Sequence, residues 1–288
     1  MKKKIYLILS ASSDIGANVA LKWLQENKTV IGTYRIQNKN TELLKKYGCK
    51  LFKVDFSKKD QILKFTKKIK KYYITNILSA VGTQEPVGKL ININFDNWQK
   101  SILVNAVYQI RCIVQIYKNH KKKLKVVLFA GGGTNNATDS YSAYTLSKIM
   151  LIKFSELISF EEKNICCSIL GPGWVKTKIH NATVKNKKAA NKNYIRTIKK
   201  LKSNECVPME KVLECIEWMF KKDKKTLGGR NISLVYDNWG SKELDALLKS
   251  DQNIYKLRRY KNDILIRKKI VNERNYEKKI SQNFTINS

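Results

Sequence analysis

Short apolar segments alternate with longer segments of helical period along most of the chain. Several apolar segments, such as 126–129, are continuous, as is typical of strands buried on both faces of a parallel sheet. This alternation predicts a doubly wound parallel sheet in an α/β fold of three layers, α/β/α. The expected strands are 5–9, 29–34, 50–54, 74–80, 125–130, 165–170 and 231–235, and the clearest helices are 15–27, 58–71, 95–119, 142–162 and 208–222.

Two segments interrupt the alternation. Residues 176–207 are polar and rich in Lys and Asn, and a long irregular segment inside a compact domain is usually functional. The last residues, from 261, are charged and lack turn signals. We therefore expect a single domain over residues 1–260, with a substrate lid at about 176–207, followed by a charged extension over 261–288.

The charge balance is strongly positive, with 57 Lys and Arg against 23 Asp and Glu, a net charge of +34. Only eight of the basic residues are Arg, whose planar group recognises phosphates and bases best. The remaining lysines are spread along the whole chain, which favours a solvated surface over a specific nucleic-acid site. Weak binding to polyanions would follow from the charge alone.

Cysteine spacing and hydropathy bound the class of protein further. The six cysteines form no C-x-x-C pair, which favours free thiols in a reducing compartment and no metal site. A membrane-spanning helix needs about 18 or more apolar residues, and no run approaches that length. The apolar segment 5–9 is also shorter than the roughly 7–15 residues of a signal peptide core. We expect a cytoplasmic protein without a membrane span.

Two segments are candidates for binding a phosphorylated cofactor. The turn from Ser10 to Gly16 follows the first strand and opens a helix, where backbone N–H groups and the positive helix end can hold a phosphate. An ordinary helix cap explains the same residues. At the end of the second strand Arg35 stands where an acidic residue would bind the ribose of NAD, so it can instead neutralise the 2′-phosphate of NADP, unless it is simply a surface arginine.

Tyr144 and Lys148 lie four residues apart, on one face of a predicted helix. At ~4 Å and an effective dielectric of ~20, the ammonium stabilises a phenolate by ~4 kcal/mol, which would lower the pKa of Tyr144 toward neutral. Chance alone gives about two such pairs in a chain this rich in Lys, and Tyr117 and Lys121 share the spacing. Position favours Tyr144, because it follows a buried strand and Gly131–Gly133 at the ligand-binding edge of the sheet.

Taken in order, the motifs resemble those of short-chain dehydrogenases/reductases. They are SASSDIG (10–16), Asp55, SAVG (79–82), Asn105, Tyr144-x-x-x-Lys148 and GPGWVKT (171–177). The resemblance runs from about residue 4 to 236 and implies a Rossmann-type sheet, hydride transfer between NADP(H), or less readily NAD(H), and a carbonyl or alcohol, and a homodimer or homotetramer. The segments 129–148, 171–179, 207–212 and 228–240 are also similar to a bacterial subgroup of surface-polysaccharide and flagellin-sugar pathways, which favours a sugar-related substrate.

The resemblance also implies residue roles. Tyr144 would be the general acid/base, Lys148 would lower its pKa and hold the nicotinamide ribose, and Asn105 would support a water-mediated proton relay, unless it is only a buried helix residue. A strand-ending turn explains Pro172 and Gly173 equally well. The cofactor-binding residues would be Ser10, Ser12, Ser13, Asp14, Ile15, Gly16, Arg35, Asp55, Phe56, Ala80, Val81, Gly82, Tyr144, Lys148, Pro172, Gly173, Val175 and Thr177.

The chain departs from the family where the substrate-orienting serine is expected, because Ala130 and Gly131 stand there. Ser142, and after it Thr134, are the nearby hydroxyls that we expect to replace it. Ser10 and Asp14 also stand at positions where the family has glycines. Three functions stay open: a reductase of sugar-like carbonyls, a reductase of acyl-chain carbonyls, and a regulatory protein that binds NADP(H) with little catalysis.

Overall fold

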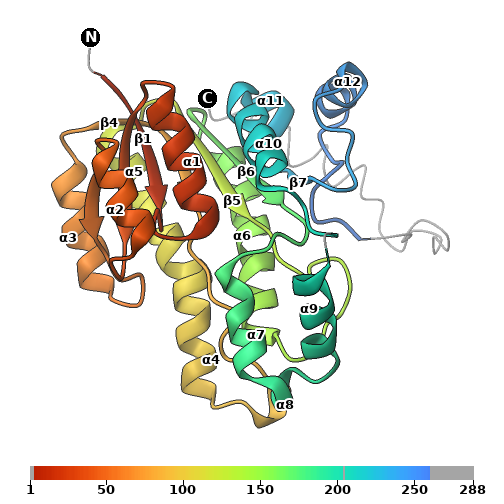
Figure 1. Ribbon diagram of the computed structural model, residues 1–288. Coiled ribbons are helices and arrows are strands. Elements are labelled where there is room, and N and C mark those ends of the chain that lie inside the picture. The colour runs from red at the N-terminus through yellow and green to blue at the C-terminus, as the bar shows by residue number, and fades with distance from the viewer. Residues whose placement is uncertain (1–2, 204, 260–288) are drawn as a thin grey trace, which may run out of the picture. The chain divides into compact units, whose positions relative to one another are not determined.

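The computed structural model describes residues 3–203 and 205–259 (Figure 1). Within them, seven strands form one parallel sheet in the order β3-β2-β1-β4-β5-β6-β7, which confirms the predicted fold class. Each predicted strand is present, with its ends shifted by at most two residues. The strands are β1 (Lys4–Leu9), β2 (Thr29–Tyr34), β3 (Lys50–Lys53), β4 (Tyr73–Ser79), β5 (Leu124–Phe129), β6 (Ile165–Gly171) and β7 (Asn231–Ser233).

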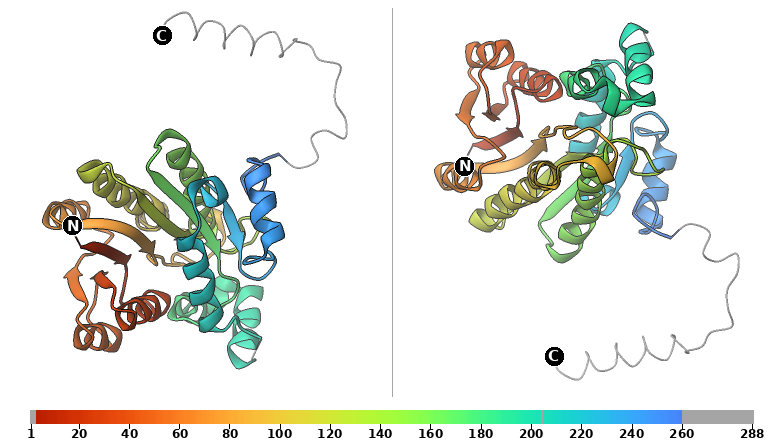
Figure 2. Two further views of the ribbon diagram at one scale, coloured as in Figure 1. Left: turned by 90° about the horizontal axis from the view of Figure 1, so that it is seen from above. Right: turned by 90° about the horizontal axis from the view of Figure 1, so that it is seen from below.

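Helices cover both faces of the sheet (Figure 2). Those joined directly to the sheet are α1 (Asp14–Gln25), α2 (Lys39–Lys46), α3 (Lys59–Ile69), α5 (Tyr108–His120), α6 (Ser142–Glu161), α10 (Met209–Lys221), α11 (Lys224–Leu227) and α12 (Lys242–Ser250). Before α5 come the short turn η1 (Leu90–Asn92), α4 (Phe95–Ile102) and a π-helical turn, η2 (Leu103–Val107). The expected helix 95–119 is therefore interrupted by a π turn.

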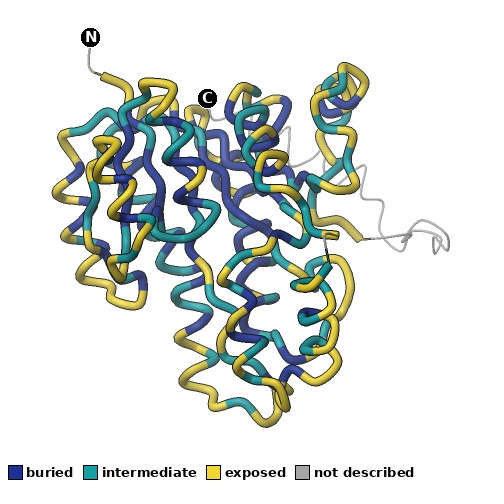
Figure 3. Tube along the Cα trace, viewed as in Figure 1, coloured by how far each residue is buried: buried dark blue, intermediate teal, exposed yellow. Residues whose placement is uncertain are grey.

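Two hydrophobic cores lie on opposite faces of the sheet. Along β1, Leu7 and Leu9 pack into the core beneath α3, α5 and α6, whereas Ile8 packs into the core beneath α1 and α10. Successive side chains of a strand point to opposite faces, so a strand covered on both sides is apolar throughout. Figure 3 shows the result as buried strands between half-exposed helices.

The lid segment, residues 176–207, is helical where we expected a loop. It contains the turn η3 (Lys178–His180), α7 (Asn181–Lys185), α8 (Lys187–Ala190) and α9 (Lys192–Lys202). Along α9 the partly buried apolar residues Tyr194, Ile198 and Leu201 recur at helical spacing, and Lys has a high helix propensity. The many polar residues of this segment are the solvent-exposed face of short helices.

Contacts group the described residues up to Lys256 into one compact unit. The predicted domain boundary near residue 260 stays a prediction, and the charged extension 261–288 lies outside the described residues. None of the helices described is long and apolar enough to span a membrane.

Candidate active site

The carboxyl ends of β1, β4, β5 and β6 form one edge of the sheet. The register pairs Leu9 with Ser79 and Phe129 with Leu170, so the segments that follow these four strands leave the sheet side by side. The chain order changes direction between β1 and β4, and in such sheets ligands bind at this switch point. The helices of the lid segment lie beyond the same edge, in the lower part of Figure 1.

The turn after β1 is both a helix cap and a set of free donors. Ser13 Oγ donates to the Ser10 carbonyl (2.7 Å) and accepts from the Gly16 N–H (3.2 Å), while Ser10 has a left-handed φ of 66°. A Cβ at Gly16 would lie 2.8 Å from Ser13 Oγ, so the turn requires glycine there. Among the described residues, no acceptor meets the N–H groups of Asp14 and Ile15. These donors at the positive end of α1 fit a bound diphosphate.

The segment after β2 packs on this turn through residues that we did not predict. The side chains of Asn38 and Asn40 both donate to the Ser12 carbonyl (3.1 and 3.2 Å). Asn38 also caps α2 in a reciprocal capping box with Thr41, a signal that the sequence does carry. Arg35 lies just before this strap, is exposed, and pairs with no carboxylate in the described part of the chain.

Asp55 and Phe56 follow β3, as predicted, and differ in their surroundings. The Asp55 carboxylate accepts from the Ser57 N–H (2.8 Å), and the Asp55 N–H donates to Gln61 Oε1 (2.8 Å). Phe56 is buried in the core beneath α3. Asp55 is therefore partly exposed, whereas Phe56 is not.

Asn105 lies in the π turn η2, a distortion that is frequent at functional sites. Its side chain accepts from the Thr83 N–H (2.8 Å) and donates to the Thr83 carbonyl (2.9 Å). A Cβ at Gly82 would lie 3.7 Å from Asn105 Oδ1 and 3.9 Å from Lys148 Nζ. The fold thus brings together Gly82, Asn105 and Lys148, three predicted site residues far apart in the sequence.

Gln109 is a site residue that sequence reasoning missed. It is buried and donates to the carbonyl of Asn105 (2.6 Å) and to that of Val81 (3.3 Å), while its own oxygen accepts from Ser79 Oγ (2.6 Å). The π turn displaces carbonyls from regular helical bonding, and Gln109, four residues on, supplies the donor. One side chain thereby fixes the end of β4 to the turn that carries Asn105.

Tyr144 and Lys148 are both buried in α6, with the Lys148 ammonium 5.4 Å from the centre of the Tyr144 ring. The expected lowering of the phenol pKa is wrong for this environment. Burial raises the pKa of Tyr144 to about 12, and burial lowers the pKa of Lys148 to about 8. Desolvation disfavours the charged form of each group and outweighs their attraction. At neutral pH Tyr144 is therefore protonated and can act as a proton donor.

The other Tyr–Lys pair of this spacing, Tyr117 and Lys121, lies elsewhere. Tyr117 donates from its hydroxyl to Glu162 (3.0 Å), and Lys121 ends α5 with a left-handed φ of 49° just before β5, at the opposite edge of the sheet. Of the two tyrosines, Tyr144 therefore lies at the ligand-binding edge of the sheet, and Tyr117 does not.

Gly131 lies against the phenol, at the position where the expected serine is missing. A Cβ there would lie 2.8 Å from both Cζ and the hydroxyl oxygen of Tyr144, so the ring occupies the space of any side chain at 131. Thr134 Oγ1 donates to the Gly131 carbonyl (3.2 Å). Ser142 Oγ instead accepts from Trp98 Nε1 of α4 (3.1 Å). Of the two hydroxyls proposed from sequence, Thr134 is the one that contacts the residue beside the phenol.

The turn after β6 begins at Pro172 and is tightly folded. Gly173 has a left-handed φ of 72°, and a Cβ on it would lie 2.9 Å from the Val207 side chain. Val175 is buried, and its carbonyl accepts a hydrogen bond from His180 Nε2 (3.0 Å). The His180 ring stacks on Trp174 (4.0 Å between ring centres), and burial lowers the pKa of His180. The stacked pair fixes the start of the lid segment.

Thr177 and the residue after it connect this turn to α1. Thr177 precedes η3, and the next N–H, that of Lys178, donates to Asp14 Oδ2 (2.7 Å). Further along the lid segment, Thr183 Oγ1 lies 2.6 Å from the Tyr141 hydroxyl and donates to Gln84 Oε1 (3.1 Å). The lid segment is therefore bonded to the segments that follow β1, β4 and β5.

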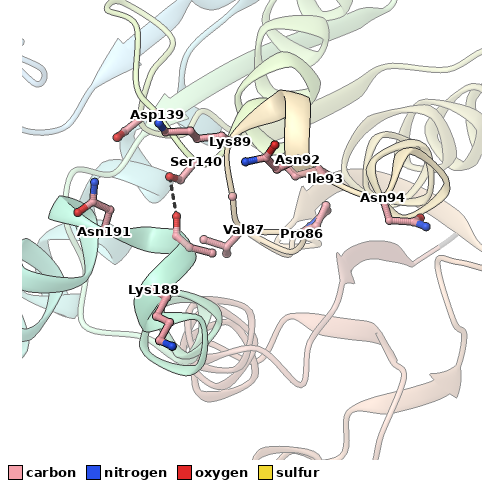
Figure 4. A pocket seen from close by; sticks show the side chains of 12 residues that line it. Pro86, Val87, Lys89, Asn92, Ile93, Asn94, Asp139, Ser140, Lys188 and Asn191 are labelled. Carbon is pink, nitrogen blue, oxygen red and sulfur yellow. Dashed lines mark hydrogen bonds between the residues drawn. The ribbon is translucent and has the colours of Figure 1, made fainter.

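A cavity of about 460 Å³ opens between the lid segment and the loop after β4 (Figure 4). Ser140 Oγ donates to the Ala189 carbonyl (2.9 Å) and closes one wall. Most of the lining surface is apolar, and asparagine amides and lysines supply the polar part. The lining residues are Pro86, Val87, Gly88, Lys89, Asn92, Ile93, Asn94, Asp139, Ser140, Lys188, Ala189 and Asn191. Over the described ranges, no cluster of three or more His, Cys, Asp or Glu forms a metal site.

The doubly wound sheet carries a donor-rich turn, a buried Tyr–Lys pair and a helical segment at one edge, which is an arrangement typical of oxidoreductases that use a nucleotide cofactor. A profile of the family described as short chain dehydrogenase matches residues 4–188, more than half of the chain. The chain belongs to this family and is an oxidoreductase.

Known proteins similar to the chain are reductases and oxidoreductases. The 3-oxoacyl-acyl-carrier-protein reductase of Buchnera aphidicola is 28% identical over 191 residues, 62% of this chain and 76% of that protein. An uncharacterized oxidoreductase of Saccharomyces cerevisiae is 26% identical over 182 residues, 60% of this chain and 71% of that protein. A crystal structure of actinorhodin polyketide ketoreductase with NADPH has the same fold, with a TM-score of 0.69 at 16% identity over 81% of this chain and 97% of that chain.

Proposed function

We propose that the protein is an NADP(H)-dependent oxidoreductase that transfers a hydride between nicotinamide and a carbonyl or alcohol, with Tyr144 as general acid/base. The observation that carries this proposal is the protonated Tyr144 hydroxyl against Gly131, beside Lys148, at the ligand-binding edge of the sheet. A similar ketoreductase structure contains NADPH. NADPH oxidation followed by absorbance over a panel of carbonyl compounds tests the proposal.

The residues at this edge fit the cofactor. The free N–H groups of the Ser10–Gly16 turn would hold the diphosphate, and the exposed Arg35 would meet the 2′-phosphate. Asp55 would lie near the adenine, and the turn from Pro172 to Thr177 would flank the nicotinamide. When bound, the cofactor supplies or accepts the hydride.

The chain itself supplies the proton and the geometry. Tyr144 gives its hydroxyl proton to the carbonyl oxygen in the reductive direction and takes it back in the oxidative one. The Lys148 ammonium stabilises the resulting phenolate, and Asn105 and Gln109 hold the backbone beside Lys148 in place. The lid segment excludes water from the reacting atoms, which strengthens these electrostatic interactions.

The preference for NADPH over NADH should reverse in Arg35→Asp. A charge-assisted contact contributes about 1.5–3 kcal/mol, so its loss should weaken NADPH binding by roughly 10–100-fold while NADH binding improves. Nicotinamide fluorescence titration with both cofactors measures the effect, with Arg35→Lys as the control that keeps the charge. Equal affinities of the unmodified protein for NADPH and NADH would contradict the role of Arg35.

We further propose that Thr134, rather than Ser142, takes the place of the missing serine. A hydroxyl near the carbonyl donates a hydrogen bond that strengthens as charge develops on the oxygen, and losing such a donor costs about 10²–10³ in kcat. Thr134→Val should show this loss, whereas Ser142→Ala, which loses only the bond from Trp98, should stay within about threefold of normal. A larger loss of kcat in Ser142→Ala than in Thr134→Val would assign the role to Ser142. Normal turnover in both variants would contradict the hypothesis that a nearby hydroxyl replaces the serine.

For the substrate we propose a sugar-related carbonyl or alcohol. The amides of Asn92, Asn94 and Asn191 line the cavity beside the lid segment and offer donors and acceptors for hydroxyl groups. The Buchnera relative favours an acyl-chain carbonyl as the second candidate. Turnover of sugar carbonyls against 3-oxoacyl thioesters distinguishes the two, and NADPH binding without turnover of either would favour a regulatory protein.

We propose a homodimer or homotetramer in the cytoplasm. Leu157 and Phe160 on α6 and Phe95 on α4 are large apolar side chains at the surface of the single chain, as helices that pack against a second copy would have. The described cysteines are all free thiols, which is usual in a reducing compartment.

A further inference from the structure

Asp14 stands at the position where the family has a glycine, in the first turn of α1. Its carboxylate accepts the backbone N–H of Lys178 (2.7 Å), and the Lys178 ammonium lies 3.8 Å from the other carboxylate oxygen. Within residues 3–203 and 205–259, Lys178 is the basic side chain within ion-pair distance of Asp14. This pair joins the cofactor turn to the lid segment across 164 residues of sequence.

The negative charge of Asp14 opposes the binding of a diphosphate at this turn. The N–H groups proposed to hold the diphosphate belong to Asp14 itself and to Ile15, so a bound diphosphate lies close to the Asp14 carboxylate. Like charges at such a distance repel, and a cation between them removes the repulsion. Lys178 is placed to do so, because its side chain is 57% exposed and its ammonium has three donors, which a single long ion pair leaves largely unused.

The residue after Lys178 reaches the catalytic end of the site. The Ile179 side chain lies 3.9 Å from the position of a Cβ on Gly82, as does Lys148 Nζ. Three consecutive residues, Thr177 to Ile179, therefore extend from the first turn of α1 to Gly82, which Lys148 Nζ also approaches. A ligand that holds Lys178 therefore also holds this segment in place between α1 and Gly82.

We propose that Lys178 is a ligand of the cofactor diphosphate, that it neutralises Asp14, and that this pair couples cofactor binding to closure of the lid segment. The inference rests on the proposed function, because it assumes a dinucleotide at this turn. It is independent of Arg35, since the diphosphate is common to NADPH and NADH.

A double-mutant cycle tests the proposal by nicotinamide fluorescence titration of the full-length chain. Lys178→Met should weaken NADPH and NADH binding by similar factors of at least tenfold. Asp14→Asn keeps an acceptor for the Lys178 N–H but removes the charge, so adding it to Lys178→Met should restore most of the lost affinity. Lys185→Met, at an exposed lysine of α7 in the same lid segment, is the matched control, and its affinities should stay within twofold of those of the unmodified protein.

Hydrogen exchange of residues 178–190 gives a readout without turnover. NADPH should slow the exchange of this segment in the unmodified protein, and Asp14→Ala should speed it before cofactor is added, with the melting temperature as a check on folding. The proposal is overturned if the cofactor affinities of Lys178→Met stay within twofold of those of the unmodified protein, or if only NADPH binding is weakened. It is also overturned if adding Asp14→Asn to Lys178→Met restores none of the lost affinity. If the unmodified protein binds neither cofactor, the proposed function itself fails.

Discussion

Replacing Tyr144 by phenylalanine is expected to lower kcat by about 10²–10⁴-fold, the loss typical of a positioned general acid. The reason lies in the surroundings of the hydroxyl. Burial raises the pKa of Tyr144 to about 12, so at neutral pH the group holds its proton until the carbonyl oxygen becomes basic enough to take it. The phenyl ring fills the same space beside Gly131, so the dissociation constant for NADPH should change less than threefold.

Tyr141→Phe is a matched control, because Tyr141 lies three residues away and its hydroxyl contacts Thr183 rather than Gly131. It should retain kcat to within about tenfold, since one ordinary hydrogen bond contributes about 1 kcal/mol. Steady-state kinetics on any carbonyl that the unmodified protein reduces measures both variants. Full activity in Tyr144→Phe would assign the proton transfer to another group.

The sequence predicts most of the fold, because both hydrophobic cores leave a direct pattern. A strand covered on two faces must be apolar throughout, and Val126–Phe129 is. The helices of the lid segment were missed because their buried apolar residues are sparse. In α9, Tyr194, Ile198 and Leu201 are interspersed with basic and other polar residues. There the polar composition concealed a helical period that the structure shows.

Motif order identifies candidate site residues in the sequence, but properties that depend on burial or on contacts between elements cannot be predicted from it. Tyr144, Lys148 and Asn105 were predicted from motif order, and in the fold Lys148 and Asn105 both lie close to Gly82. The direction of the Tyr144 pKa was wrong, because spacing reveals the attraction of Lys148 but not the burial of both groups. Gln109 was missed because nothing in the sequence signals a π turn whose carbonyls need a donor.

Lys148→Met is expected to make the protein more stable at pH 7 while abolishing most of its activity. Burial lowers the pKa of Lys148 from 10.5 to about 8. Each unit of pKa difference corresponds to about 1.4 kcal/mol, so the buried ammonium costs about 3 kcal/mol of folding free energy, as an order of magnitude. Methionine has a similar length and no charge, so it removes this cost. It also removes the cation that stabilises the phenolate, and both kcat and cofactor affinity should fall.

The pH dependence of the stabilisation separates this explanation from a simple gain in packing. Below pH 8 Lys148 is protonated in both the folded and the unfolded chain, and the folded state carries the full cost. Between pH 8 and 10.5 the unfolded chain binds more protons, so the stability of the unmodified protein rises with pH and approaches that of Lys148→Met. Burial also raises the pKa of Tyr144, so ionisation of this tyrosine in the unfolded chain lowers stability as the pH rises through 10. Both proteins share this loss, which leaves the difference in stability between them nearly unchanged. Urea unfolding at pH 7 and pH 9.5 measures the difference, and a gap that stays constant between these values would show that desolvation of Lys148 is not its cause.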